Sequence, residues 1–148
     1  MRREETVDFN IRATWHAIAR MYNQQAVRYG GTMATGFVLL NIDSEEGTPA
    51  TKIAPLMGLE ARSLTRLLKS METSGLIHRQ ADRNDRRLVK IFLTEEGKKK
   101  KEKAREVVLQ FNNVVRKRIS SSKLANFFEV LQVINKVVEE AIYEKLKV

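Results

Sequence analysis

Cysteine is absent from this chain of 148 residues. Without thiols the protein has no disulfide bonds, no thiolate nucleophile, no cysteine-based zinc site and no means of sensing oxidants through cysteine. Long apolar runs are missing too, since none approaches the roughly 18 residues that a membrane-spanning helix needs. Residues 1–5 lead into no apolar core of the kind that a signal peptide has. These absences predict a cytoplasmic protein with no membrane partner.

Side chains that carry catalysis or bind metals are also scarce. The two histidines, His16 and His78, have no other metal-ligand types clustered near them, so we expect packing or surface roles and no metal site. The sequence contains no paired carboxylates, no Ser/His/Asp set and no phosphate-binding glycine loop. It therefore predicts a protein that is not an enzyme and holds no cofactor.

Positive charge is concentrated in one part of the chain. The formal net charge is +9. Residues 1–59 carry no net charge, residues 60–105 carry +7 and residues 106–148 carry +2. A charge needed only for solubility would be spread more evenly. The concentration indicates a polyanionic partner that meets the middle of the chain.

Two short helical segments joined by a tight turn precede and begin this basic region. The first is predicted over residues 51–57, with Thr51 as its N-cap and Gly58 closing it. The second is predicted over about 60–73 and is closed by Gly75. Its apolar residues fall three and four apart and form one stripe: Ala61, Leu64, Leu67, Leu68 and Met71. The residues off the stripe carry donors for phosphates and base edges: Arg62, Ser63, Thr65, Arg66 and Lys69.

A basic hairpin follows directly. Residues 76–81 lead into a turn, and residues 88–93 are rich in the β-branched and aromatic types that suit a strand. The Asp and Asn residues between them are turn formers, and three arginines occupy the five positions 83–87. A helix–turn–helix followed by a basic β-hairpin predicts a winged helix, and duplex DNA is its expected ligand.

These motifs resemble those of the MarR (multiple-antibiotic-resistance-repressor) family of winged-helix regulators. The similarity rests on a small residue, a turn glycine and an apolar residue: Ala54, Gly58 and Leu64. It continues through Ser63–Leu68, Glu72–Ile77, and Asp82–Arg87 leading to Leu93–Gly97. The resemblance implies a mainly α fold with a small β-hairpin wing, forming one domain over residues 1–148. A winged helix–turn–helix core over about 34–97 would be flanked by dimerisation helices over about 1–30 and 98–148.

Each candidate DNA contact has an alternative. Arg62 and Arg66 are expected to bond guanine edges, whereas Ser63 and Thr65 would meet base edges or phosphate. The alternative is that the polar side of this helix is an ordinary solvated face, made up of Arg62, Ser63, Thr65, Arg66 and Lys69. In the wing, Arg83 and Arg86 are the candidates for reaching the minor groove. The family resemblance implies that Asp85 braces the hairpin by pairing with Arg87, which is the third candidate DNA-binding residue of the wing.

Four further helices are predicted over residues 8–29, 34–43, 95–119 and 122–146, with Thr94 capping the third. A loop is predicted over residues 44–49. The terminal helices carry more apolar surface than the core could cover. They would pack into a monomeric bundle or, as the resemblance implies, interlock in a two-fold homodimer. Two recognition helices roughly 34–36 Å apart would then enter successive major grooves of a pseudo-palindromic duplex.

Other features are open to two interpretations. Residues 98–101, four consecutive lysines, are expected to form a solvated face rather than to contact distant phosphates. The family often carries a small-molecule effector pocket, which Arg12, Trp15, His16 and Tyr22 would line if they are not core or interface residues. The expected function is a sequence-specific, homodimeric transcription repressor, released by such an effector if one exists. The alternatives are a winged-helix protein-interaction module and a sequence-indifferent architectural DNA-binding protein.

Overall fold

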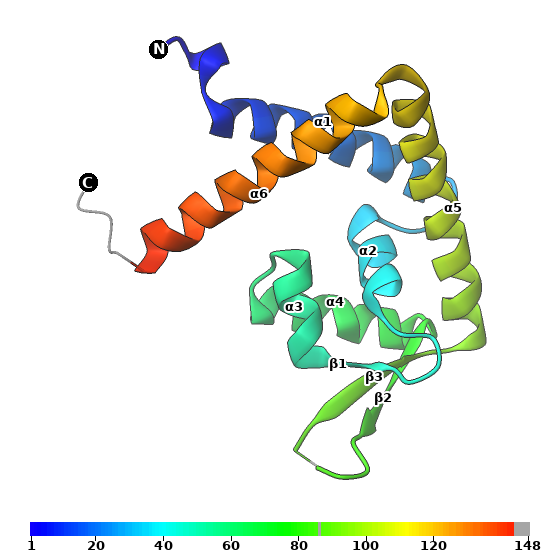
Figure 1. The fold of residues 1–148 in the computed structure, drawn as a ribbon. Coiled ribbons are helices and arrows are strands. Elements are labelled where there is room, and N and C mark those ends of the chain that lie inside the picture. Colours follow the sequence, from blue (N-terminus) through cyan, green and yellow to red (C-terminus); the bar gives the residue numbers. More distant parts are fainter. Residues whose placement is uncertain (86, 144–148) are drawn as a thin grey trace. The chain divides into compact units, whose positions relative to one another are not determined.

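The computed structural model describes residues 1–85 and 87–143. Packing divides the chain into two compact units, residues 1–107 and 108–148. Figure 1 follows the elements in chain order: the 3-10 helix η1 (Arg3–Glu5), α1 (Val7–Val27), α2 (Met33–Asn41), β1 (Thr48–Pro49), α3 (Ala50–Met57), α4 (Ala61–Thr73), β2 (Ile77–Ala81), β3 (Val89–Leu93), α5 (Glu95–Arg118) and α6 (Ser121–Tyr143). The predicted long helices agree with α1, α2, α5 and α6 to within about two residues over the described part of the chain.

The core of the first unit lies between α2, α3, α4 and a small sheet. Its fully buried side chains come from α2, α3, the strands and the residue after α2: Val38, Leu39, Ile42, Ile53, Ile77 and Ile91. From α4, Leu64, Leu68 and Met71 join them, and each is at most 3% exposed. Burying one such side chain contributes roughly 1.5–3 kcal/mol to stability. This cluster therefore holds the helix–turn–helix and the sheet together as one body.

The sheet has three antiparallel strands in the order β1-β3-β2. Strands β2 and β3 pair along their whole length, which confirms the predicted hairpin. Ile77, Ile91 and Leu93 are buried on the side that faces the helices. On the outer face, His78 lies opposite Phe92, and their rings stack with centroids 5.6 Å apart. His78 is exposed and stacks on Phe92, so it is a surface residue with a packing contact, within the roles expected of it.

Strand β1 was not expected from the sequence. The loop predicted over residues 44–49 is wrong at its end, where Thr48 and Pro49 pair with β3. A two-residue strand containing a proline has no local signal, because a distant partner alone defines it. The predicted cap is also wrong: Pro49 occupies the N-cap position of α3, so Thr51 lies inside the first turn. The strand runs into the helix without an intervening turn, which leaves no place for a capping side chain.

Thr94 connects the sheet to α5 as predicted. Its hydroxyl accepts a hydrogen bond from the Gly97 N–H at 3.0 Å and donates one to the Gly75 carbonyl at 2.6 Å. Its own N–H donates to the Leu76 carbonyl at 3.1 Å. Gly97 is buried against this junction, and a Cβ added there would overlap the Leu76 carbonyl oxygen. Only glycine fits where α5 meets the strand entry.

Two lysines of α5 bind backbone carbonyls near the ends of other helices. Lys100 donates to the Tyr29 carbonyl just after α1. Lys101 donates to the Ile42 carbonyl at the end of α2, at 2.6 Å, and to the Ser44 hydroxyl at 3.1 Å. The last carbonyls of a helix lack intrahelical partners and carry partial negative charge, so an ammonium there is favourable.

The solvated face predicted for residues 98–101 is therefore wrong for two of its four lysines. Lys98 pairs with Glu95 at 3.4 Å, and Lys99 is exposed. The other two serve as intramolecular donors. A run of four identical side chains gives no local sign of this difference, because the accepting carbonyls come from distant parts of the sequence.

Aromatic side chains join α1 to α2. The Phe37 ring lies 6.2 Å from Trp15 and 5.7 Å from Tyr22, with the second pair edge to face. Burial raises the pKa of the Tyr22 phenol above its ordinary value. These contacts favour the packing interpretation of Tyr22, which is buried, and of Trp15, although Trp15 is 47% exposed. Arg12 and His16 are exposed.

Gly97→Ala should destabilise the protein by about 2–3 kcal/mol, because the added methyl group meets a backbone carbonyl that cannot move alone. The free energy of unfolding in urea, at one protein concentration, measures this. Gly36→Ala is the matched control, since Gly36 is helical and its added Cβ would lie 3.6 Å from the Ala104 Cβ, an ordinary contact. It should be neutral or stabilise by about 0.5–1 kcal/mol. Equal losses in the two variants would contradict this account.

Lys101→Met should lower the free energy of unfolding by about 1–2 kcal/mol, because the Ile42 carbonyl loses a charged donor. Lys99→Met removes the same charge from an exposed neighbour and should change stability by less than about 0.5 kcal/mol. Chemical denaturation of both variants tests the difference. A loss at Lys99 as large as that at Lys101 would mean that net charge, not this contact, matters.

Candidate nucleic-acid interface

Helix α4 buries its apolar side and leaves its polar side exposed. Arg62, Arg66 and Lys69 follow one another at steps of four and three, so they form a row along the helix. The row lies on the side away from Leu64 and Leu68, which are in the core. All three cations are exposed, and within residues 1–85 and 87–143 none of them has a carboxylate partner. This cation row on α4 is available to an anion outside the chain.

The remaining predicted residues of α4 lie beside the cation row. Ser63 and Thr65 are exposed. The Thr65 hydroxyl donates to the Ala61 carbonyl at 2.8 Å, so its proton is already used within the helix. Glu60 occupies the N-cap position without a side-chain hydrogen bond to the helix. The first N–H groups of α4 therefore lack the cap that a Ser, Thr or Asp would supply.

The hairpin over residues 77–93 is the wing. Carboxylates accept the hydrogen bonds that hold its turn in place. One oxygen of Asp82 accepts hydrogen bonds from the N–H groups of Asn84 at 2.8 Å and Asp85 at 3.2 Å. The Asp82 N–H donates to the Leu88 carbonyl at 2.8 Å, which closes the turn. Asp85 and Arg87 do meet, but the carboxylate accepts from the Arg87 backbone N–H at 2.9 Å. A brace between Asp85 and the Arg87 guanidinium stays a prediction.

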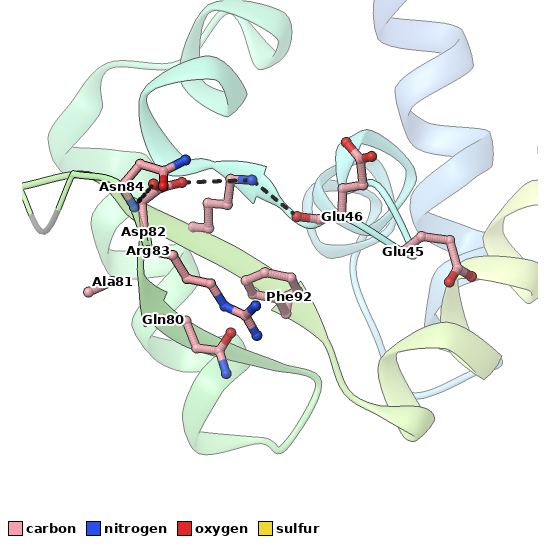
Figure 2. Close-up of a pocket in the computed structure, with 9 residues that line it drawn as sticks. Glu45, Glu46, Gln80, Ala81, Asp82, Arg83, Asn84 and Phe92 are labelled. Carbon is pink, nitrogen blue, oxygen red and sulfur yellow. Dashed lines mark hydrogen bonds and ion pairs between the residues drawn. The ribbon is translucent and has the colours of Figure 1, made fainter.

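The arginines of the wing differ in how they are presented. Arg83 points back over the outer face of the sheet, beside Gln80 and Phe92, where a hollow of about 460 Å³ lies (Figure 2). Arg87 is exposed. Arg86, the other predicted minor-groove residue, lies outside the described residues. In this conformation Arg83 would have to change rotamer to reach a groove beyond the turn.

An ion pair that the sequence analysis missed joins the wing to α4. Arg79 of β2 lies 3.2 Å from the carboxylate of Glu72, in the last turn of α4. Both side chains are partly exposed, so the pair contributes little to stability by itself. Its position matters more, because it connects the helix that carries the cation row to the hairpin. Strand register would have been needed to find it, since only the pairing of β2 with β3 turns Arg79 toward α4.

Asp82 and Lys90 form a second connection that the sequence analysis missed. Their charged atoms lie 3.8 Å apart, and the Lys90 ammonium also donates to the Glu46 carbonyl at 3.5 Å. The N–H of Asn84, followed by that of Asp85, lowers the pKa of the Asp82 carboxyl, which therefore stays ionised at neutral pH. The sequence marks Asp82 only as a turn former. Its partner becomes visible when the strands are in register.

Other chemistry finds no support in the part of the chain that the structure describes. No three His, Asp or Glu side chains gather there in an arrangement able to hold a metal ion. None of its helices combines the length and the apolar character needed to cross a membrane. The features that remain are the exposed cation row and the basic wing, both in the first unit.

Comparisons with known proteins agree with this geometry. Residues 32–89 match the model of the MarR family. The chain is 38% identical over 90 residues to the HTH-type transcriptional regulator TtmR of Methylorubrum extorquens, a match that covers 61% of this chain and 46% of that protein. The match therefore spans less than half the length of TtmR.

Two further proteins are similar over more of their length. The organic hydroperoxide resistance transcriptional regulator of Bacillus subtilis is 31% identical over 107 residues, which cover 72% of this chain and 73% of that protein. The crystal structure of the S. aureus MepR–DNA complex superposes with a TM-score of 0.81 over 89% of this chain and 98% of that chain. Its 20% identity establishes the shared fold alone. On the family match, the similarity to the Bacillus protein and the winged-helix architecture, the chain belongs to the MarR family.

Proposed function

We propose that this protein is a sequence-specific, double-stranded DNA-binding transcription regulator that acts as a homodimeric repressor in the cytoplasm. It would be a binding protein and not an enzyme. The observation that carries the proposal is the cation row on α4, which faces away from the core and has no carboxylate partner within the described residues. The relatives named above are transcriptional regulators, and MepR was crystallised with DNA.

The two basic elements suit different parts of a duplex. Helix α4 would enter the major groove, where an arginine bonds guanine O6 and N7 in a bidentate manner. The wing would lie over the neighbouring minor groove, where arginine senses groove width and negative potential. The Glu72–Arg79 pair supports this arrangement, because it holds the two elements to one another. Phosphate neutralisation would supply most of the affinity.

Exposed apolar surface supports a homodimer. Phe127, Val130, Val133 and Val137 lie on α6 at steps of three and four, and each is more than half exposed in the single chain. Apolar surface of this extent marks a protein-interaction site. A second copy of the chain is the proposed occupant, with the predicted dimerisation helices over about 1–30 and 98–148 flanking a core over about 34–97. A two-fold dimer would present α4 twice, matching a pseudo-palindromic site.

Selection of bound duplexes from a random pool tests the proposal most directly. A regulator of this kind should enrich a two-fold-related motif whose half-sites are about one helical turn apart. An architectural binder would enrich no motif, and a protein-interaction module would retain no DNA. If each dimer neutralises about six to ten phosphates, affinity should fall about 10³–10⁵-fold between 50 and 200 mM salt. Repeating the selection with candidate small molecules would test release by an effector, which stays a prediction.

Arg66→Ala should weaken binding to the selected duplex by about 5- to 150-fold, the cost of losing one bidentate base contact. Fluorescence anisotropy at fixed salt measures the change. Lys123→Ala is the control, because it removes an exposed cation from α6 in the second unit. It should change affinity less than about twofold. Equal losses in the two variants would indicate that overall charge, and not the α4 surface, determines affinity.

Val133→Asp should shift the protein from a dimer of about 34 kDa toward the 17.0 kDa chain, because a carboxylate would be buried in the interface. Light scattering at micromolar concentration measures the mass. Gln132→Asp introduces the same residue on another side of α6, at an exposed position, and should leave the dimer intact. A wild-type particle of 17 kDa would refute the dimer.

A further inference from the structure

We propose that Asp82 and Lys90 are positioning residues for DNA binding, which fix the angle of the wing by tying it to the loop over residues 43–47. This inference rests on the proposed DNA-binding function. Neither residue is assigned a contact with DNA. They would act by holding the wing in the conformation in which its arginines meet the duplex.

Asp82 sits where the hairpin leaves its strand pairing. The last pair of the ladder joins Ala81 to Val89, and Asp82 follows immediately. Its side chain is only 19% exposed, although the residues of the turn beyond it that the structure describes are open to solvent. One oxygen holds the N–H groups of Asn84 and Asp85, and the other faces Lys90. The same side chain thus shapes the turn and connects it to the body of the sheet.

Lys90 joins the wing to a second element. It lies opposite Gln80 in β2 and Pro49 in β1, so its side chain extends over the outer face of the sheet. There its ammonium lies between the Asp82 carboxylate and the Glu46 carbonyl, as the dashed lines in Figure 2 indicate. Both contacts are long, at 3.8 and 3.5 Å, so each is weak. Together they connect the turn of the wing to the loop that precedes β1.

The loop over residues 43–47 is itself held in place by several contacts. One oxygen of Asp43 accepts hydrogen bonds from the N–H groups of Glu45 at 2.9 Å and Glu46 at 2.8 Å. Gly47 has a φ of +68° and lies so close to the Phe92 ring that an added Cβ would come within 2.7 Å of it. Lys101 of α5 holds the start of the loop by donating to the Ile42 carbonyl. A wing tied to this loop is tied to the whole first unit.

Two possible effects of the Asp82 side chain on DNA binding predict opposite changes in affinity when it is replaced: repulsion of phosphate by its charge, and positioning of the wing. A carboxylate beside a DNA-binding arginine repels phosphate, so its removal should strengthen binding if only the electrostatic field mattered. If Asp82 and Lys90 hold the binding-competent wing, their removal lowers the fraction of molecules in that conformation and weakens binding by the same factor. Asp82→Asn separates the two effects, because its amide oxygen still accepts from the turn while the charge is lost.

The experiment compares the affinity of Asp82→Asn, Asp82→Ala, Lys90→Met and the Asp82→Asn/Lys90→Met double variant for the selected duplex. If the two residues position the wing, Asp82→Asn should bind about 2- to 5-fold more weakly than the wild type, and Asp82→Ala about 10-fold more weakly. The double variant should bind no more weakly than Lys90→Met alone. Glu45→Gln is the matched control, since it removes the same charge from the same hollow. It should bind as tightly as the wild type or more tightly. Tighter binding by Asp82→Asn would overturn the proposal.

Two further measurements separate this proposal from a general loss of stability and from failure of the proposed function. Hydroxyl-radical footprints of Asp82→Ala should lose protection in the minor groove under the wing and keep protection where α4 binds; uniform loss would overturn the proposal. In the free protein, amide exchange at Asn84, Asp85 and Leu88 should be faster in Asp82→Ala than in the wild type. If amide exchange at these residues is unchanged, the proposal that Asp82 orders the turn of the wing is overturned, and this test needs no DNA. Wild-type protein that binds no duplex would instead refute the proposed function.

Discussion

The burial of one stripe of α4 is the constraint on which the rest of the molecule depends. Leu64, Leu68 and Met71 must lie in the core, and this requirement fixes the rotation of the helix about its own axis. Because a helix has 3.6 residues per turn, fixing one side fixes the other. The cation row on α4 therefore has no alternative place inside the protein. Its exposure is a consequence of core packing and needs no separate stabilising interaction.

The sequence was sufficient where periodicity and turn chemistry act locally. The stripe of α4, the hairpin, the Thr94 cap and the long helices all follow from residues close together in the chain. It was insufficient where distant partners decide the structure. Strand β1 exists because Thr48 and Pro49 lie against β3, and nothing in the two residues themselves indicates a strand.

The candidate site divides in the same way. The exposure of Arg62, Arg66 and Lys69 follows from helical spacing. Their availability to DNA follows from the lack of a carboxylate partner within the described residues, where Glu72 pairs with Arg79 instead. The Glu72–Arg79 and Asp82–Lys90 pairs depend on strand register and loop position, which composition does not reveal. The lysine run of α5 is the clearest case, since Lys99 and Lys101 are identical and only two positions apart, yet Lys99 is exposed and Lys101 binds the Ile42 carbonyl.

The Thr65 hydroxyl has a chemical consequence for the DNA that this helix would favour. Its only proton is committed to the Ala61 carbonyl, so toward solvent it offers lone pairs and a methyl group. Guanine presents only acceptors in the major groove, whereas adenine and cytosine present amino groups and thymine presents a methyl. If guanine were the base that faces Thr65, the lone pairs of the Thr65 oxygen would lie opposite the guanine acceptors, and no hydrogen bond could form. If Thr65 faces a base edge, as we propose, the hydrogen bond within the helix would disfavour guanine at that position.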